Sequence, residues 1–193
     1  MPIKALFSIG GTMNKLVLLE IFSEDNLNLH LLHMKSFAGR YSILEKSIPR
    51  LAGIPINEIY RLGLKKDELD DALEFFSCHE AHKIFFDSFA HLTKKCENVK
   101  KHFGSDEKFL YEVFECARSG SYGFVFVYLD KRSKPQIEFT ASRDGFTRYS
   151  PILALDVFEH AYFWDYGFEK ERYLRAAISR FDIEKLEMAL TLG

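Results

Sequence analysis

The chain has 193 residues, of which 47% are hydrophobic and 28% charged, a composition typical of a soluble globular protein of one or two small domains. Its formal net charge of −2 gives no basis for binding nucleic acid or an acidic membrane through overall charge. Three cysteines without a C-x-x-C pair argue against a disulfide framework or a cysteine-rich zinc site and favour a reducing, cytoplasmic setting. The apolar run 16–19 is far too short to span a bilayer, and we interpret it as a core segment.

The N-terminal half is predicted to form two long helices. From Asn26 to Ile48, aromatic, apolar and histidine residues recur at three- and four-residue spacing, and Pro49 ends the pattern. A second helix is predicted from about Asp67 to His91, where aromatic and histidine side chains share one face.

Beyond residue 97 the pattern changes. A helix from Ser105 to about Arg118 is followed by a break and by an aromatic and β-branched run that predicts a strand. The predicted strands are Tyr122–Leu129, Gln136–Thr140 and Ile152–Val157, and the predicted C-terminal helices are 159–166, 171–180 and 182–190.

Helices followed by strands and then by helices predict an α+β fold. We expect a long N-terminal α-hairpin in residues 1–97. We expect residues 98–193 to form a C-terminal α/β part with a three-stranded antiparallel sheet and flanking helices.

Two histidine pairs have H-x-x-H spacing, His30 with His33 and His79 with His82. Residues three apart lie on nearly the same side of a helix, so each pair could offer one imidazole to a site. Such a pair is a weak signal by itself, because surface histidines and hydrogen-bonded core histidines are more common than ligands.

A carboxylate and a third imidazole follow near the C-terminus. Asp156 and His160 are four residues apart, across a predicted strand end and turn. Three imidazoles and one carboxylate form a donor set for iron, manganese or zinc. The absence of E-x-x-H from the sequence argues against a carboxylate-bridged di-iron bundle.

The segment Asp156-Val157-Phe158-Glu159-His160-Ala161-Tyr162 resembles the D-x-W-E-H-A-Y motif of the iron/manganese superoxide dismutase family, with Phe158 in place of tryptophan. The resemblance implies that Asp156 and His160 are metal ligands. It extends over roughly residues 23–190 and includes 103–109, which resemble the family's F-G-S-x-E-K-F helix start.

Two N-terminal segments continue the resemblance. Residues 32–41 resemble the family's first helix. In that helix a ligand histidine is followed, eight residues later, by a tyrosine at the substrate gateway. This implies that His33, and not His30, is a ligand and that Tyr41 is the gateway residue. Residues 79–86 resemble the second-helix motif, which implies that His82, and not His79, binds the metal.

The chain departs from the family around the metal. A glutamine beside the metal-bound solvent comes from one of two places in the family, which are Cys78 and Arg118 here. Arg118, at a predicted helix end, is expected to point to water. The residues that replace family tryptophans around the site are Phe86, Tyr122, Phe124 and Phe158.

The resemblance implies a cytoplasmic, antioxidant superoxide dismutase with one iron or manganese ion per subunit, which converts superoxide to oxygen and hydrogen peroxide. It implies a homodimer in which Glu159 bonds His160 of the other subunit. Phe37 and Phe163 replace a polar pair there, and we expect their rings to pack across the dimer. We expect no nucleic-acid or membrane partner.

Two alternatives stay open. The first is a metal-binding relative with weak or altered redox activity, because the glutamine is missing. The second is a non-enzymatic interaction protein that keeps the fold. The sequence leaves the choice between iron and manganese undecided.

Overall fold

The computed structural model describes residues 14–91, 94–141 and 149–192. Residues 1–13 of the predicted N-terminal domain lie outside this part, and the division at residue 97 stays a prediction. Within the described residues, no helix is long and apolar enough to cross a membrane.

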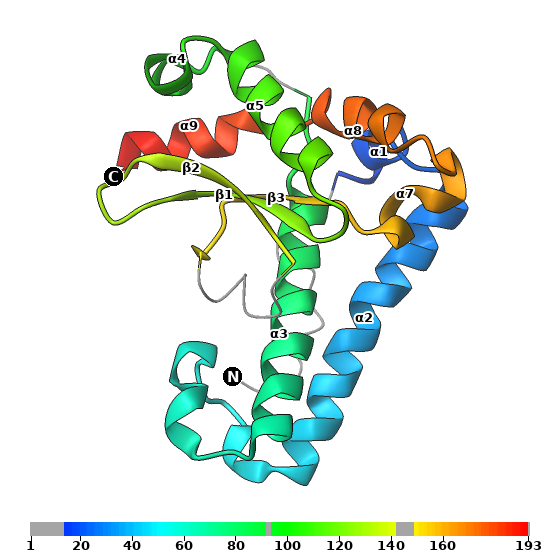
Figure 1. Cartoon of the computed structure of the whole chain (residues 1–193), viewed down its shortest axis with the longest axis vertical. Helices are drawn as coiled ribbons and strands as arrows, with labels where there is room; N and C mark the ends of the chain where they lie inside the picture. The colour runs from blue at the N-terminus through cyan, green and yellow to red at the C-terminus, as the bar shows by residue number, and fades with distance from the viewer. Residues whose placement is uncertain (1–13, 92–93, 142–148, 193) are drawn as a thin grey trace.

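Two antiparallel helices form a long hairpin, α2 (Glu24–Ser47) and α3 (Lys66–Asp87), joined by two 3-10 turns, η2 (Pro49–Leu51) and η3 (Ile56–Leu62). The hydroxyl of Ser23 accepts a hydrogen bond from the Asn26 amide and caps α2. Figure 1 shows the connected end of the hairpin projecting away from the sheet. A small core lies at that end, made of Tyr41, Leu51, Ile59, Ala72 and Leu73.

Helix α3 ends four residues before the predicted His91. Phe89 forms a β-bridge with Phe181, and the Ala90 amide donates to the Arg180 carbonyl. The backbone of this segment therefore pairs with residues far along the chain instead of continuing the helix.

A three-stranded antiparallel sheet follows, with strand order β2-β1-β3. Its strands are β1 (Phe124–Leu129), β2 (Pro135–Thr140) and β3 (Leu153–Asp156). The register places Phe124 opposite Asp156, at the end of β3. The predicted α+β fold, with a hairpin of long helices and a three-stranded antiparallel sheet, is confirmed.

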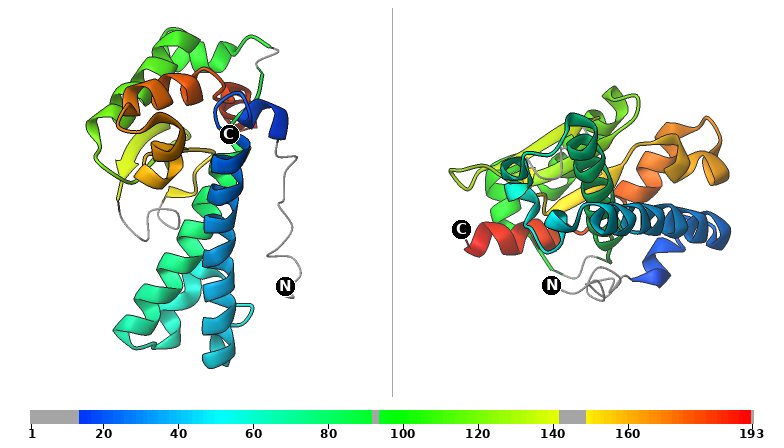
Figure 2. Two further views of the ribbon diagram at one scale, coloured as in Figure 1. Left: turned by 90° about the vertical axis from the view of Figure 1, so that its right-hand side faces the viewer. Right: turned by 90° about the horizontal axis from the view of Figure 1, so that it is seen from below.

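The remaining helices flank the sheet and the hairpin. They are α1 (Lys15–Leu18), α4 (Glu97–Phe103), α5 (Asp106–Ser119), α7 (Glu159–Tyr166), α8 (Lys170–Ile178) and α9 (Ile183–Leu192). Figure 2 (left) shows the sheet and α7 beside the end of the hairpin where α2 begins. One hydrophobic core joins this end of the hairpin to the sheet and to α5, α7, α8 and α9.

Polar contacts fix α7 against the start of α2. The buried side-chain amide of Asn26 donates to the Ala161 carbonyl at 3.1 Å and to the Asp165 carboxylate at 3.0 Å. Asp165 also accepts the Ser23 amide at 2.8 Å. These contacts hold α7 next to the first turn of α2.

Replacing Asn26 is expected to loosen this junction. Asn26→Ala removes two hydrogen bonds and leaves the Ala161 carbonyl without this partner, at an expected loss of about 1–3 kcal/mol in the free energy of unfolding. Urea unfolding measures the loss, and the exposed Asn28→Ala on the same helix is the control. Equal stability of the two variants would contradict this role of Asn26.

Candidate metal centre

Four side chains from four elements converge at the junction of hairpin, sheet and α7. His30 comes from α2, His82 from α3, Asp156 from the end of β3 and His160 from the first turn of α7. Their candidate ligand atoms all lie within 4.8 Å of one another. Three nitrogens and one carboxylate oxygen form a donor set for iron, manganese or zinc.

The spacing of these atoms fits a single ion. Asp156 Oδ2 lies 3.1 Å from His30 Nε2, 3.2 Å from His160 Nε2 and 3.4 Å from His82 Nε2. The Nε2 atoms of His82 and His160 are 3.4 Å apart. Ligands held about 2.1 Å from one ion lie about 3.0–3.6 Å apart at bond angles of 90–120°. The four residues therefore fit a bound metal.

Burial sets the protonation of the donors. It lowers the pKa of His82 to about 3 and also lowers the pKa of His30. Burial alone would raise the pKa of Asp156, but His160 and His30 beside the carboxyl lower it well below its usual range. Neutral His30 and His82 beside an ionised Asp156 are in the forms that a metal requires. The Asp156 carboxylate raises the pKa of His160 against the effect of its burial, so a metal there displaces a proton that the ring holds more readily.

Backbone groups orient the ligands. Asp156 Oδ1 accepts the Phe158 amide at 2.8 Å, which leaves Oδ2 for the imidazoles. The Asp156 carbonyl accepts the hydroxyl of the buried Tyr173 at 2.7 Å. The other ring nitrogen of His82 lies 2.5 Å from the Cys78 carbonyl, so it donates there when Nε2 faces the cluster.

Residues 91–189, about half of the chain, match the family described as iron/manganese superoxide dismutases, C-terminal domain. The chain belongs to this family. The match includes Asp156 and His160, whereas His30 and His82 lie outside it and join the site through the geometry above.

The structure places His30, and not His33, in the cluster, so the predicted choice between them does not agree with the geometry. His30 is buried against the rings of Phe85 and Phe86. His33 is half-buried beside the cluster, with its ring centroid 4.2 Å from that of His160. Three residues advance a helix by about 300°, so the two imidazoles leave α2 in directions about 60° apart.

Tyr41 also lies elsewhere than predicted from the superoxide dismutase resemblance. It follows His30 by eleven residues, which is about 16 Å along a helix. Its ring packs against Phe76 in the small core at the far end of the hairpin, and burial raises the pKa of its hydroxyl to about 12. This position does not suit a gateway residue.

Aromatic rings surround the cluster. Phe86 lies 4.9 Å from the His30 ring, Phe124 lies 5.3 Å from the His82 ring, and Phe158 stacks on His160 at 5.5 Å. Tyr122 packs on Phe158 from an exposed position. The rings limit water around the ligands on this side.

Phe37 is buried within its own chain. It is 8% exposed and packs on the rings of His33 and His82, at 4.8 and 5.8 Å. The expected ring contact between Phe37 and Phe163 of another subunit stays a prediction, and 8% of Phe37 is left for it in the single chain. Phe163 itself is 48% exposed.

The other predicted residues lie around this site or away from it. Arg118 forms an ion pair with Glu115 on the surface of α5, as expected for a residue that faces water. Glu159 is exposed at the start of α7. His79 is buried beside Glu80 and stands outside the cluster.

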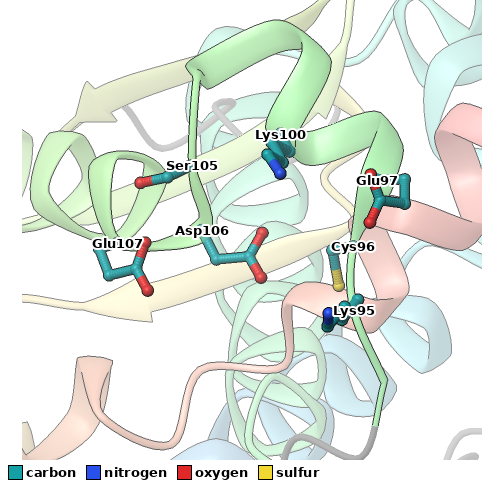
Figure 3. Close-up of a pocket in the computed structure, with 7 residues that line it drawn as sticks. All are labelled: Lys95, Cys96, Glu97, Lys100, Ser105, Asp106 and Glu107. Carbon is teal, nitrogen blue, oxygen red and sulfur yellow. The ribbon is translucent and has the colours of Figure 1, made fainter.

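A cavity of about 250 Å³ lies between α4 and α5, away from the cluster (Figure 3). Cys96 and Asp106 line it together with Lys95 and Lys100. Burial raises the pKa of Cys96 to about 11, so its thiol stays protonated near neutral pH. In the described part of the chain, the metal-compatible group is the His30 cluster.

Proposed function

We propose that this protein is a superoxide dismutase that holds one iron or manganese ion per subunit through His30, His82, Asp156 and His160. The convergence of three Nε2 atoms on Asp156 Oδ2, in a chain of this family, carries the proposal. When bound, such an ion would supply redox chemistry that converts two superoxide anions and two protons to one oxygen molecule and one hydrogen peroxide molecule.

The side chains prepare the site for this chemistry. Asp156 stays ionised and offsets part of the ionic charge, while neutral His30 and His82 contribute lone pairs. The Phe158 amide fixes the carboxylate, and the Cys78 carbonyl fixes the His82 ring. Orientation of ligands by such partners tunes the affinity for metal and its redox potential.

A small anion can reach the cluster from the surface between α2 and α7. A pocket of about 240 Å³ opens there, with His30 and His160 in its wall. We propose this opening as the approach for superoxide.

A relative with weak or altered redox activity is the second candidate, because the described residues around the ligands include no glutamine. Cys78 contributes a backbone carbonyl, and Arg118 is held on the surface. Loss of a hydrogen bond to metal-bound solvent would change the supply of protons. A non-enzymatic interaction protein is the third candidate.

We propose a homodimer that forms through the exposed apolar face around this pocket. The exposed apolar side chains of this face are Leu29 and Leu32 on α2, Phe163 and Trp164 on α7, and Phe168 just after α7. Trp164 is 67% exposed. A contiguous apolar patch on a soluble protein marks an interaction site, and a two-fold axis would pair it with itself. Glu159 beside this face would then reach the partner's copy of the cluster.

We also propose a cytoplasmic location, which rests on the odd count of three cysteines and the absence of a C-x-x-C pair from the sequence.

Metal analysis and stopped-flow superoxide decay on the as-purified protein test the function. The proposal predicts about one iron or manganese ion per chain and a decay rate proportional to metal occupancy. Bound metal without catalysed decay would favour the second candidate. A protein without metal affinity would contradict the proposal and favour the third.

Tyr41→Phe is expected to leave metal content and superoxide decay unchanged, because its hydroxyl lies in the distant small core. Tyr173→Phe removes the hydroxyl that bonds the Asp156 carbonyl and is expected to lower metal affinity. Metal titration of both variants checks the contrast. Lower activity of Tyr41→Phe at full occupancy would restore the gateway role.

A further inference from the structure

A buried serine joins the end of helix α3 to strand β3. Ser88 is the C-cap residue of α3 and is fully buried. Its hydroxyl donates to the Ile84 carbonyl at 2.7 Å and accepts the Ala154 amide at 2.9 Å. The hydroxyl therefore uses its proton toward the helix and a lone pair toward the strand.

Strand β3 depends on this contact because it lies at an edge of the sheet. Among the described residues, the strand order is β2-β1-β3, so β3 pairs with β1 on one side. An edge strand leaves a row of backbone groups without partners from the sheet. The Ala154 amide is buried, and Ser88 supplies the acceptor that such a group requires.

The serine contact lies between two of the proposed metal ligands. His82 precedes Ser88 by six residues, which is about 9 Å along α3. Asp156 follows Ala154 by two residues, so both side chains point to the same face of β3. The place where β3 is attached to α3 therefore sets the separation of His82 Nε2 and Asp156 Oδ2, which is 3.4 Å.

The backbone around Ser88 fixes the same junction to a third segment. The Ser88 carbonyl accepts the Asp182 amide at 2.8 Å, and Phe89 forms a β-bridge with Phe181. The end of α3 is thus held in place by the segment between α8 and α9. The hydroxyl of Ser88 transmits this fixed position to β3.

We propose that Ser88 is a positioning residue for the metal centre, because its hydroxyl holds β3 at one place along α3 and so sets the geometry between His82 and Asp156. The inference rests on the ligand roles proposed for these two residues. The Cys78 carbonyl and the Phe158 amide each orient one ligand. Ser88 acts on the position of the two ligands relative to one another.

Cobalt(II)-loaded protein tests this role without redox turnover, because the visible absorption of cobalt reports the coordination geometry. Changes to residues that only orient ligands typically weaken metal binding 10–100-fold. Ser88→Ala is expected to weaken cobalt binding by roughly tenfold or more in competition with a chelator. Its visible bands should also shift at full occupancy, which a loss of stability alone would not cause.

Three further variants make the test specific. Ser88→Thr keeps the hydroxyl and is expected to restore the affinity and the bands. Ser77→Ala is the matched control, because Ser77 is a buried serine of the same helix whose hydroxyl makes no hydrogen bond within the described residues. Ser88→Cys keeps the packing with a weaker donor and acceptor, so it carries the test if Ser88→Ala does not fold.

Unchanged affinity and bands in Ser88→Ala would overturn the inference. So would an equal loss in Ser77→Ala, or a loss in Ser88→Thr as large as that in Ser88→Ala. If Ser88→Ala weakens cobalt binding in a protein whose native-metal form has no superoxide turnover, the proposed function fails and the positioning role stands. A wild type that binds no metal would remove both.

Discussion

His30→Gln is expected to lose metal, whereas His33→Gln keeps it. Nε2 of His30 lies in the group of four ligand atoms, and the His33 ring lies outside that group. Changes to residues that only orient a ligand typically weaken metal binding 10–100-fold. Removal of the His30 ligand should therefore weaken binding by at least about 100-fold, as measured by competition with a chelator.

The His33→Gln variant is a matched control, because it makes the same substitution one helical turn away. His79→Gln, a buried histidine of α3 outside the cluster, is a second control for the loss of any core imidazole. If His33→Gln lost the metal and His30→Gln kept it, the ligand assignment from the resemblance would hold and the geometry would not.

The metal-free protein is expected to lose stability as pH falls from about 6.5 to about 3. The pKa of His82 is about 3 in the folded state and 6.5 in its ordinary, unfolded environment. Between these two pH values the unfolded chain therefore binds a proton at His82 and the folded chain does not. Asp156 acts in the same direction, because its lowered pKa means that acid protonates the unfolded carboxyl first. His82 alone contributes a decrease on the order of 4 kcal/mol across this window.

Urea unfolding of the metal-free protein at a series of pH values measures this dependence. His82→Gln should make the curve less steep between pH 6.5 and 3, because one group that titrates in the unfolded state is gone. Part of the slope should remain, since the pKa of His30 is lowered as well. A wild-type stability that rises as pH falls in this window would show that His82 is not buried in its neutral form.

The secondary structure follows from local patterns in the sequence. Helix α2 covers 24–47 against a predicted 26–48, because the periodic apolar face and the proline that ends it are local signals. The end of α3 could not be predicted in this way. It depends on the pairing of Phe89 with Phe181, which are 92 residues apart.

The same difference between local and long-range signals applies to the ligands. Asp156 and His160 belong to one short motif, so the sequence could pair them. The choice between His30 and His33 depends on how α2 is rotated, which contacts between Asn26 and α7 fix across more than 130 residues. One local signal favoured His30: the buried residues Leu27 and Met34 stand three residues before and four residues after it, on the buried face of α2.

Anomalous diffraction from crystals of the metal-loaded protein, recorded at the iron and manganese absorption edges, locates the ion and identifies its ligands. We predict one peak per chain, about 2.0–2.2 Å from the Nε2 atoms of His30, His82 and His160 and from an oxygen of Asp156. A peak bonded to His33 in place of His30, or no iron or manganese at this cluster, would contradict this prediction.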